Sequence, residues 1–146
     1  MTVRLPLLPK WCRWSLFIAL AGFIFYVSII TAPPETVIDQ ARSGIGAEDL
    51  LQLDKWRHFV AYAALGGAMA YAVADTDLTS LQAAALVVSI TVLYGIGIEF
   101  GQSMIPDRYF SVGDAAANAL GGLLVLPWFA LERYLTFTPL SELLSV

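Results

Sequence analysis

Four long apolar runs, separated by shorter polar segments, dominate the pattern of the chain. They cover residues 14–32, 57–74, 81–102 and 113–131. The hydrocarbon core of a bilayer takes about 20 residues of helix, and backbone groups in lipid must bond within their own segment. Each run therefore predicts a transmembrane helix. We predict an all-α fold, an integral membrane bundle of about four transmembrane helices.

The first run is expected to stay in the chain as an anchor. It is longer than the apolar region of a signal peptide, which spans about 7–15 residues, and no small-residue cleavage site precedes Pro33. The segment 33–53 that follows is the longest connection between runs. Leucines from Leu50 to Leu53 beside acidic residues predict a short amphipathic helix on the membrane surface, which we expect to cover the polar residues described below.

Composition supports a membrane protein. The chain has 146 residues, of which 58% are hydrophobic and 14% are charged, whereas a soluble domain carries about 25% charged residues. A soluble domain of this size could not bury so much apolar surface, so the surplus must face lipid. The net charge of −4 argues against a nucleic-acid partner. No soluble-domain-sized segment remains outside the runs, so residues 1–146 are predicted to form one domain.

The number of basic residues does not decide the orientation of the chain in the membrane. With both ends inside, four Lys or Arg residues lie on each side. The flank of the first run is basic, and the first helix usually dominates topology. Three of the outer cations, Lys55, Arg57 and Arg108, stand near acidic residues and have another reason to be there. We therefore predict a multi-pass protein of the cell membrane with both ends in the cytoplasm.

Polar and charged residues enter the apolar runs at three places: the start of the second, the end of the third and the start of the fourth. They are Asp54, Lys55, Arg57, His58, Tyr62, Glu99, Gln102, Asp114 and Asn118, with Arg108 in the loop between. In an alternating bundle these three places lie on one side of the membrane. A charge in a membrane segment is costly and usually faces a partner or a cavity. The pattern predicts one polar site near the outer face.

The spacing within each group places its members on one helix face. The series are Asp54, His58 and Tyr62; Glu99 and Gln102; and Asp114 and Asn118. Small residues recur nearby at intervals of four. They are Gly97 and Gly101, and Gly113, Ala117 and Gly121. Such spacing lets membrane helices approach closely, so we expect these positions to serve helix packing.

Several of these residues also have a purely structural interpretation. Asp54 is suited to capping the second helix, and Ser111 with Asp114 forms the S-x-x-D capping pattern of the fourth. A buried Glu99 would need a cationic partner such as Lys55 or Arg108, so a structural ion pair is the alternative to a functional carboxylate.

Four short motifs together resemble the VanZ-like family. They are DKWRHFVAY at 54–62, IEFGQ at 98–102, PDR at 106–108 and DAAANALG at 114–121. The family is similar in having DKxxHFxxY, ExxQ, an arginine after a turn, and DxxxNxxG, in that order and spacing. One departure is Asp107, where a glycine is common. The resemblance implies a small multi-helix membrane protein with a cell-envelope role. It also implies a link to tolerance of the glycopeptide teicoplanin, but it implies no particular reaction.

The first hypothesis is that the site binds the phosphate-bearing headgroup of a membrane lipid or lipid-linked precursor. Lys55, Arg108 and Arg57 would hold phosphate oxygens. The other members of the predicted binding site are Asp54, Tyr62, Gln102, Asp114 and Asn118. His58 and Glu99 are the candidate catalytic residues, with His58 as general acid or base if a reaction occurs.

Three alternatives stay open. His58, Glu99 and Asp114 offer one imidazole and two carboxylates to a divalent metal, although no H-x-x-x-H or paired-cysteine spacing accompanies them. The polar cluster could also be a structural network in a non-catalytic interaction protein. An ion pathway is the third alternative, but nothing polar continues through the middle of the runs. The residues predict neither a cofactor nor an oligomeric state.

Overall fold

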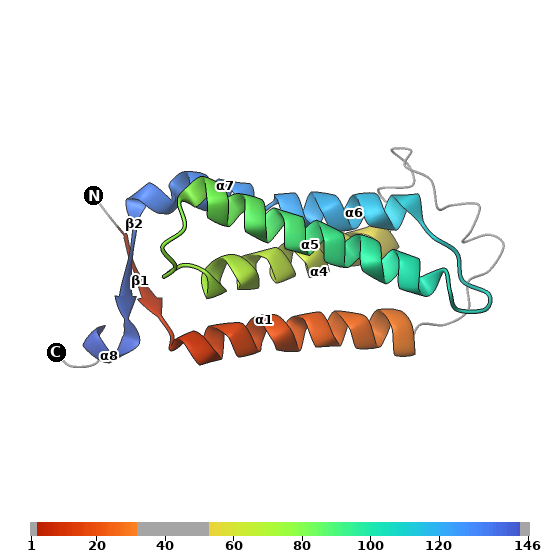
Figure 1. Cartoon of the computed structure of the whole chain (residues 1–146), viewed down its shortest axis with the longest axis horizontal. Helices are drawn as coiled ribbons and strands as arrows, with labels where there is room; N and C mark the ends of the chain where they lie inside the picture. Colours follow the sequence, from red (N-terminus) through yellow and green to blue (C-terminus); the bar gives the residue numbers. More distant parts are fainter. Residues whose placement is uncertain (1–2, 32–52, 144–146) are drawn as a thin grey trace.

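The computed structural model describes residues 3–31 and 53–143, and most of them are helical (Figure 1). The long helices are α1 (Lys10–Phe25), which continues into the π-helical turn η1 (Tyr26–Ile30), α4 (Leu53–Ala72), α5 (Ser80–Gln102) and α6 (Val112–Leu123). The shorter elements are β1 (Val3–Leu7), α7 (Leu126–Leu131), η2 (Glu132–Tyr134), β2 (Leu135–Pro139) and α8 (Leu140–Leu143). The predicted surface helix and lid in 33–53 fall almost entirely outside the described residues.

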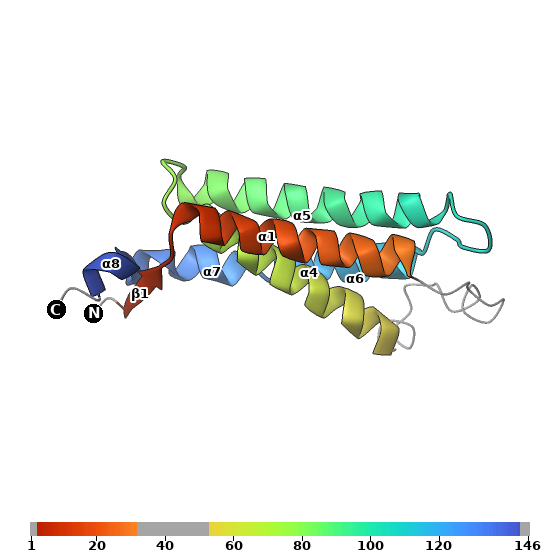
Figure 2. The ribbon, with the colours of Figure 1, turned by 90° about the horizontal axis from the view of Figure 1, so that it is seen from below.

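Within the described residues, three segments are long and apolar enough to cross a membrane: Lys10–Ile30, Ser80–Gln102 and Val112–Leu131. They correspond to the first, third and fourth predicted runs. The second run, α4, has 20 residues but carries polar residues in its first turns, and it is not among those three. In both ribbon views α4 runs lengthwise beside the other helices (Figures 1 and 2), and it packs most extensively on α6. The three apolar helices make this a membrane protein.

The fourth run is not one continuous helix. Pro127 lies at the start of α7 and cannot donate a backbone hydrogen bond to the preceding turn. The chain tightens just before it, where Leu124 N donates to Gly121 O at 3.1 Å and Val125 N to Gly122 O at 3.4 Å. These are i to i−3 bonds, as in a 3₁₀ turn. The sequence prediction of one helix over 113–131 overlooked this proline.

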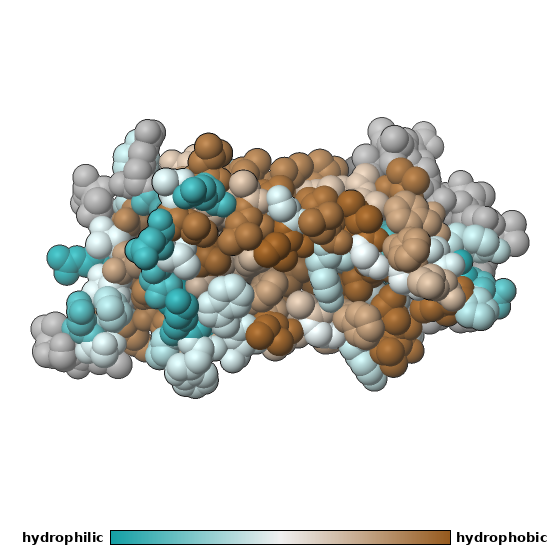
Figure 3. All heavy atoms as spheres, viewed as in Figure 1, coloured by the Kyte–Doolittle hydropathy of each residue, from teal (hydrophilic) through white to brown (hydrophobic). Residues whose placement is uncertain are grey.

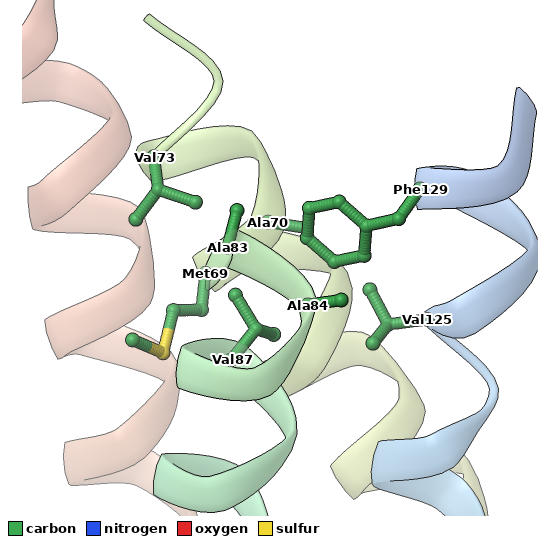
Figure 4. Packing of buried hydrophobic residues seen from close by; sticks show 8 residues of the cluster. All are labelled: Met69, Ala70, Val73, Ala83, Ala84, Val87, Val125 and Phe129. Atoms are coloured by element: carbon green, nitrogen blue, oxygen red, sulfur yellow. The ribbon is translucent and has the colours of Figure 1, made fainter. Parts of the chain in front are cut away.

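The apolar core lies where α4, α5 and the α6–α7 junction meet, and Figure 4 shows its side chains pointing toward one another. Its members are Met69, Ala70, Val73, Ala83, Ala84, Val87, Val125 and Phe129. Many other large apolar side chains point outward, among them Leu93 (66% exposed) and Phe100 (61%). In Figure 3 apolar residues cover the middle of the visible face, while hydrophilic residues gather toward its ends. Such a surface matches lipid rather than water.

A short β-ribbon departs from the predicted all-α fold. β1 and β2 pair in parallel, from Val3 opposite Leu135 to Leu7 opposite Pro139. This pairing brings residues 3–7 and 135–139 together at one end of the bundle (Figure 1). Five-residue strands at opposite ends of a sequence leave little local signal, because their pairing is entirely non-local.

Arg13, which belongs to the basic flank of the first run, is a buried structural residue with 1% of its surface exposed. Its guanidinium donates to Leu8 O at 2.9 Å, to Tyr71 O at 3.0 Å and to Ala72 O at 3.1 Å. It also forms an ion pair with Asp75 at 2.6 Å. The last carbonyls of a helix lack partners within the helix, so Arg13 caps α4 and ties it to the start of α1.

Replacing Asp75 with asparagine is expected to destabilise the protein near neutral pH but not in acid. The hydrogen bond from Arg13 holds the pKa of Asp75 below its ordinary value of 3.8. The unfolded chain therefore binds this proton more tightly than the folded one. The contribution of Asp75 is complete above the ordinary pKa and is lost as the pH falls through the folded-state pKa. Thermal melts of wild type and Asp75→Asn in detergent should begin to approach each other below about pH 4 and meet once the pH is below the folded-state pKa; a gap independent of pH would contradict this role.

Candidate functional site

The polar residues of three helices meet at the end of the bundle opposite the β-ribbon. The start of α4, the end of α5 and the start of α6 all lie at this end (Figure 1). The buried polar residues there, which we call the polar network, are Lys55, Glu99, Ser111, Asp114 and Asn118, with the partly buried His58 at its side. The helix order alone predicted this convergence.

Lys55 is held by an ion pair rather than presented to a ligand. Its Nζ lies 2.5 Å from Asp114 Oδ1 and 3.7 Å from Asp54 Oδ2. The side chains of Lys55 and Asp114 are only 6% and 11% exposed, whereas Asp54 is 58% exposed. The ammonium is thus neutralised by carboxylates of its own chain. This arrangement weakens the hypothesis that Lys55 binds phosphate.

Ser111 joins the loop before α6 to the Glu99 carboxylate, to the Lys55 ammonium and to the backbone of Asp114. Its hydroxyl accepts a hydrogen bond from Asp114 N at 3.1 Å, which confirms it as the N-cap of α6. The same hydroxyl lies 3.5 Å from Lys55 Nζ, and Ser111 N donates to Glu99 Oε2 at 3.3 Å. Glu99 is completely buried. Ser111 was predicted only as a cap, but it also fixes Glu99 against α6.

A second chain of contacts leads from Glu99 to His58. Asn118 Nδ2 lies 3.5 Å from Glu99 Oε1, and Asn118 Oδ1 lies 3.0 Å from His58 Nδ1. The other imidazole nitrogen, His58 Nε2, is 3.8 Å from Asp114 Oδ1. His58 is 18% exposed, so it stands between the buried residues and the surface. The predicted helix-face series therefore do place side chains of α4, α5 and α6 next to one another.

Tyr62 lies deeper in the bundle than His58. It is 1% exposed, and its hydroxyl finds no hydrogen-bond partner in the described part of the chain. Gly95 makes this packing possible, because an added Cβ would lie 3.0 Å from Tyr62 Cε1 and 2.9 Å from Asn118 Cβ. Gly95 is one turn before Glu99 on α5, so its missing side chain lets α5 bring Glu99 close to α6. Gly95 belongs to no small-residue repeat, so the pattern of the sequence does not single it out.

Gln102 and Arg108 are placed differently from the network. Gln102 donates from Nε2 to Ser28 O at 3.0 Å, so it binds the π-helical end of α1 and not the other site residues. Arg108 is half-buried in the loop after α5, and Arg57 is exposed on α4. The neighbouring Asp107 has a φ of 61°, in the left-handed region that favours glycine. This conformation explains why a glycine is expected at position 107.

The residues that could bind a divalent metal differ from the predicted set. Single ligand atoms of Asp54, His58 and Asp114 lie within 4.8 Å of one another, whereas the sequence suggested Glu99 in place of Asp54. The Lys55 ammonium contacts both carboxylates of this group. A divalent ion bound there would have to displace Lys55, so the geometry favours the ammonium as the cation.

Comparison with known proteins covers most of the chain. A family model described as VanZ/LLP1 matches residues 14–131. This stretch runs from within α1 to the end of α7 and contains the whole polar network. No curated protein and no solved structure matches the chain.

Proposed function

The chain belongs to the VanZ/LLP1 family, as its motifs predicted, and from this premise we propose that it binds a phosphate-bearing headgroup at the outer face of the cell membrane. In this proposal α1, α4, α5 and α6–α7 all cross the membrane, and both chain ends lie in the cytoplasm. The bound molecule is a membrane lipid or a lipid-linked precursor of the cell envelope.

The arrangement of α4 supports its inclusion as a fourth crossing. Its polar side chains Lys55 and Tyr62 are buried against the other helices, and Val60 is 59% exposed on its outer side. The pairing of β1 with β2 requires both chain ends on one side, which fits an even number of crossings. The polar network then lies on the opposite side, at the height of lipid headgroups.

The observation that carries the proposal is the position of the polar network. It occupies one end of an otherwise apolar bundle and reaches the surface through His58 and Asp54. Arg57 is exposed and Arg108 half-buried near the same helix ends. Lys55 is buried against Asp114, so the two more exposed guanidinium groups are the better candidates for phosphate oxygens, which arginine binds with two parallel hydrogen bonds.

Replacing Arg57 and Arg108 with glutamine is expected to weaken binding of anionic lipid about tenfold or more, since a hydrogen bond to a charged group contributes about 1.5–3 kcal/mol. Native mass spectrometry of the detergent-solubilised protein with phosphatidylglycerol or a polyprenyl phosphate measures this. A neutral diacylglycerol is the lipid control, and Lys10→Gln at the other end of the bundle is the protein control. Equal binding by all three proteins would contradict the proposed site.

The cell-envelope role follows if the bound molecule is a lipid-linked precursor. Expression of the chain would then alter the sensitivity of bacteria to teicoplanin, in line with what its family implies. The double arginine variant should abolish the change. His58 and Glu99 remain the candidate residues if a reaction occurs, but the complete burial of Glu99 separates it from any headgroup.

A further inference from the structure

We infer that Glu99 and Asn118 are positioning residues that fix the proton of His58 on Nδ1, leaving Nε2 to accept a hydrogen bond from a hydroxyl of the bound headgroup. The substrate class this adds is a headgroup with a free hydroxyl beside its phosphate. The inference about the bound hydroxyl rests on the proposed function, whereas the proton position of His58 does not.

The first step is the orientation of the Asn118 amide. If Glu99 is ionised, its carboxylate only accepts hydrogen bonds, and the atom of Asn118 that faces Glu99 Oε1 is then the NH₂ nitrogen. The amide oxygen then faces His58 Nδ1 at 3.0 Å. An amide oxygen also only accepts, so His58 Nδ1 must carry the proton. In the neutral imidazole the lone pair is therefore on Nε2.

The second step is what surrounds Nε2. It lies 3.8 Å from Asp114 Oδ1, too far for a hydrogen bond, and that carboxylate already accepts from Lys55. A group entering here meets only acceptors, because carboxylate oxygens of Asp54 and Asp114 lie within 4.8 Å of an imidazole nitrogen of His58. Lys55 already supplies a cation to both carboxylates, so a neutral donor fits better than a second ammonium. A hydroxyl donates a hydrogen bond, whereas a phosphate oxygen without a proton could only accept.

The third step is how rigidly Glu99 is held. Ser111 N donates to Glu99 Oε2 at 3.3 Å, and the carboxylate has no exposed surface. If Glu99 became glutamine, Ser111 N–H would bind the amide oxygen, and the new NH₂ would face Asn118. Asn118 would then turn its oxygen toward position 99 and its NH₂ toward His58. His58 Nδ1 would become the acceptor, and the proton would move to Nε2.

The experiment reads the tautomer directly, since His58 is the only histidine in the chain. Protein labelled with ¹⁵N in the imidazole ring, in detergent at neutral pH, gives one pair of ring-nitrogen signals. We expect a protonated Nδ1 in wild type and a protonated Nε2 in Glu99→Gln. Asn118→Leu should lose the Nδ1 proton as well. Gln102→Met, on the same helix but bonded to Ser28 O, should keep the wild-type tautomer.

A purely structural network predicts something else: the variants would melt at lower temperature while the tautomer stayed the same. An Nε2–H tautomer in wild type, or an unchanged tautomer in both Glu99→Gln and Asn118→Leu, would overturn the inference. None of these readouts requires lipid, so failure of the proposed headgroup binding leaves them intact.

The hydroxyl is tested with two lipids of equal charge. Phosphatidylglycerol carries a headgroup hydroxyl and phosphatidylmethanol does not. Wild type should bind phosphatidylglycerol about five- to tenfold more tightly, the effect of one net hydrogen bond. Equal binding of both lipids by wild type would refute the hydroxyl assignment, whereas binding of neither would refute the proposed function itself.

Discussion

Replacing Gly121 with alanine is expected to be among the most damaging single changes in this chain. An added Cβ would lie 2.3 Å from Phe59 O and 3.1 Å from Ala63 N, both backbone atoms of α4. A backbone atom cannot turn aside as a flexible side chain can, so α4 and α6 would have to separate. Overpacking of a tight core costs about 1–3 kcal/mol and occasionally more, and we expect about 3 kcal/mol or more here.

Gly97→Ala is the matched control, because an added Cβ at Gly97 meets nothing within 4 Å. Alanine is also the better helix former by about 1 kcal/mol, so this variant should be neutral or slightly more stable. Thermal melts followed by size-exclusion chromatography in one detergent compare the two. If Gly121→Ala and Gly97→Ala had the same melting temperature, α4 and α6 would not be in close contact at Gly121.

Replacing Lys55 with methionine is the second change expected to have a large effect. It leaves Asp114 buried without its ammonium partner, and breaking a buried ion pair from one side costs about 3–5 kcal/mol. Replacing both partners, as in Lys55→Met with Asp114→Leu, removes the unpaired charge and should recover much of this loss. The measurement is the melting temperature of the single and double variants in detergent.

The control for this series is Arg57→Met, two residues away and exposed. Surface changes of this kind usually stay within about 0.5 kcal/mol. If Lys55→Met had the same melting temperature as wild type, the ion pair would not stabilise the folded protein. A double variant as unstable as the single one would assign the loss to Ser111 or to packing instead.

The glycines show where sequence reasoning succeeded and where it could not. Spacing selected both Gly97–Gly101 and the series ending at Gly121 as packing positions. In the structure Gly121 lies against the backbone of α4, but Gly97 faces open space and Gly101 would meet only the tip of Ile29. Spacing shows which residues share a helix face, but it does not show what that face contacts.

For the polar residues too, the sequence predicted which helix ends meet but not which atoms contact each other. The order of the helices was enough to expect that α4, α5 and α6 bring their polar ends together. It could not show that Gln102 turns to α1 or that Arg13 caps α4. Those bonds join residues 74 and 58 positions apart, and only the folded chain determines which backbone carbonyls are within reach.

The β-ribbon places a condition on biosynthesis. β1 precedes every helix that the structure describes, yet its partner β2 follows α7, so β1 must wait until the helices between the two strands have been made. Parallel pairing also needs both strands in the same compartment. In the proposed arrangement of four crossings, a chain that failed to insert one helix would leave β1 and β2 on opposite sides, where the ribbon cannot form. Pairing of β1 with β2 is therefore a late step in folding, and it requires that the helices between the strands have been inserted correctly.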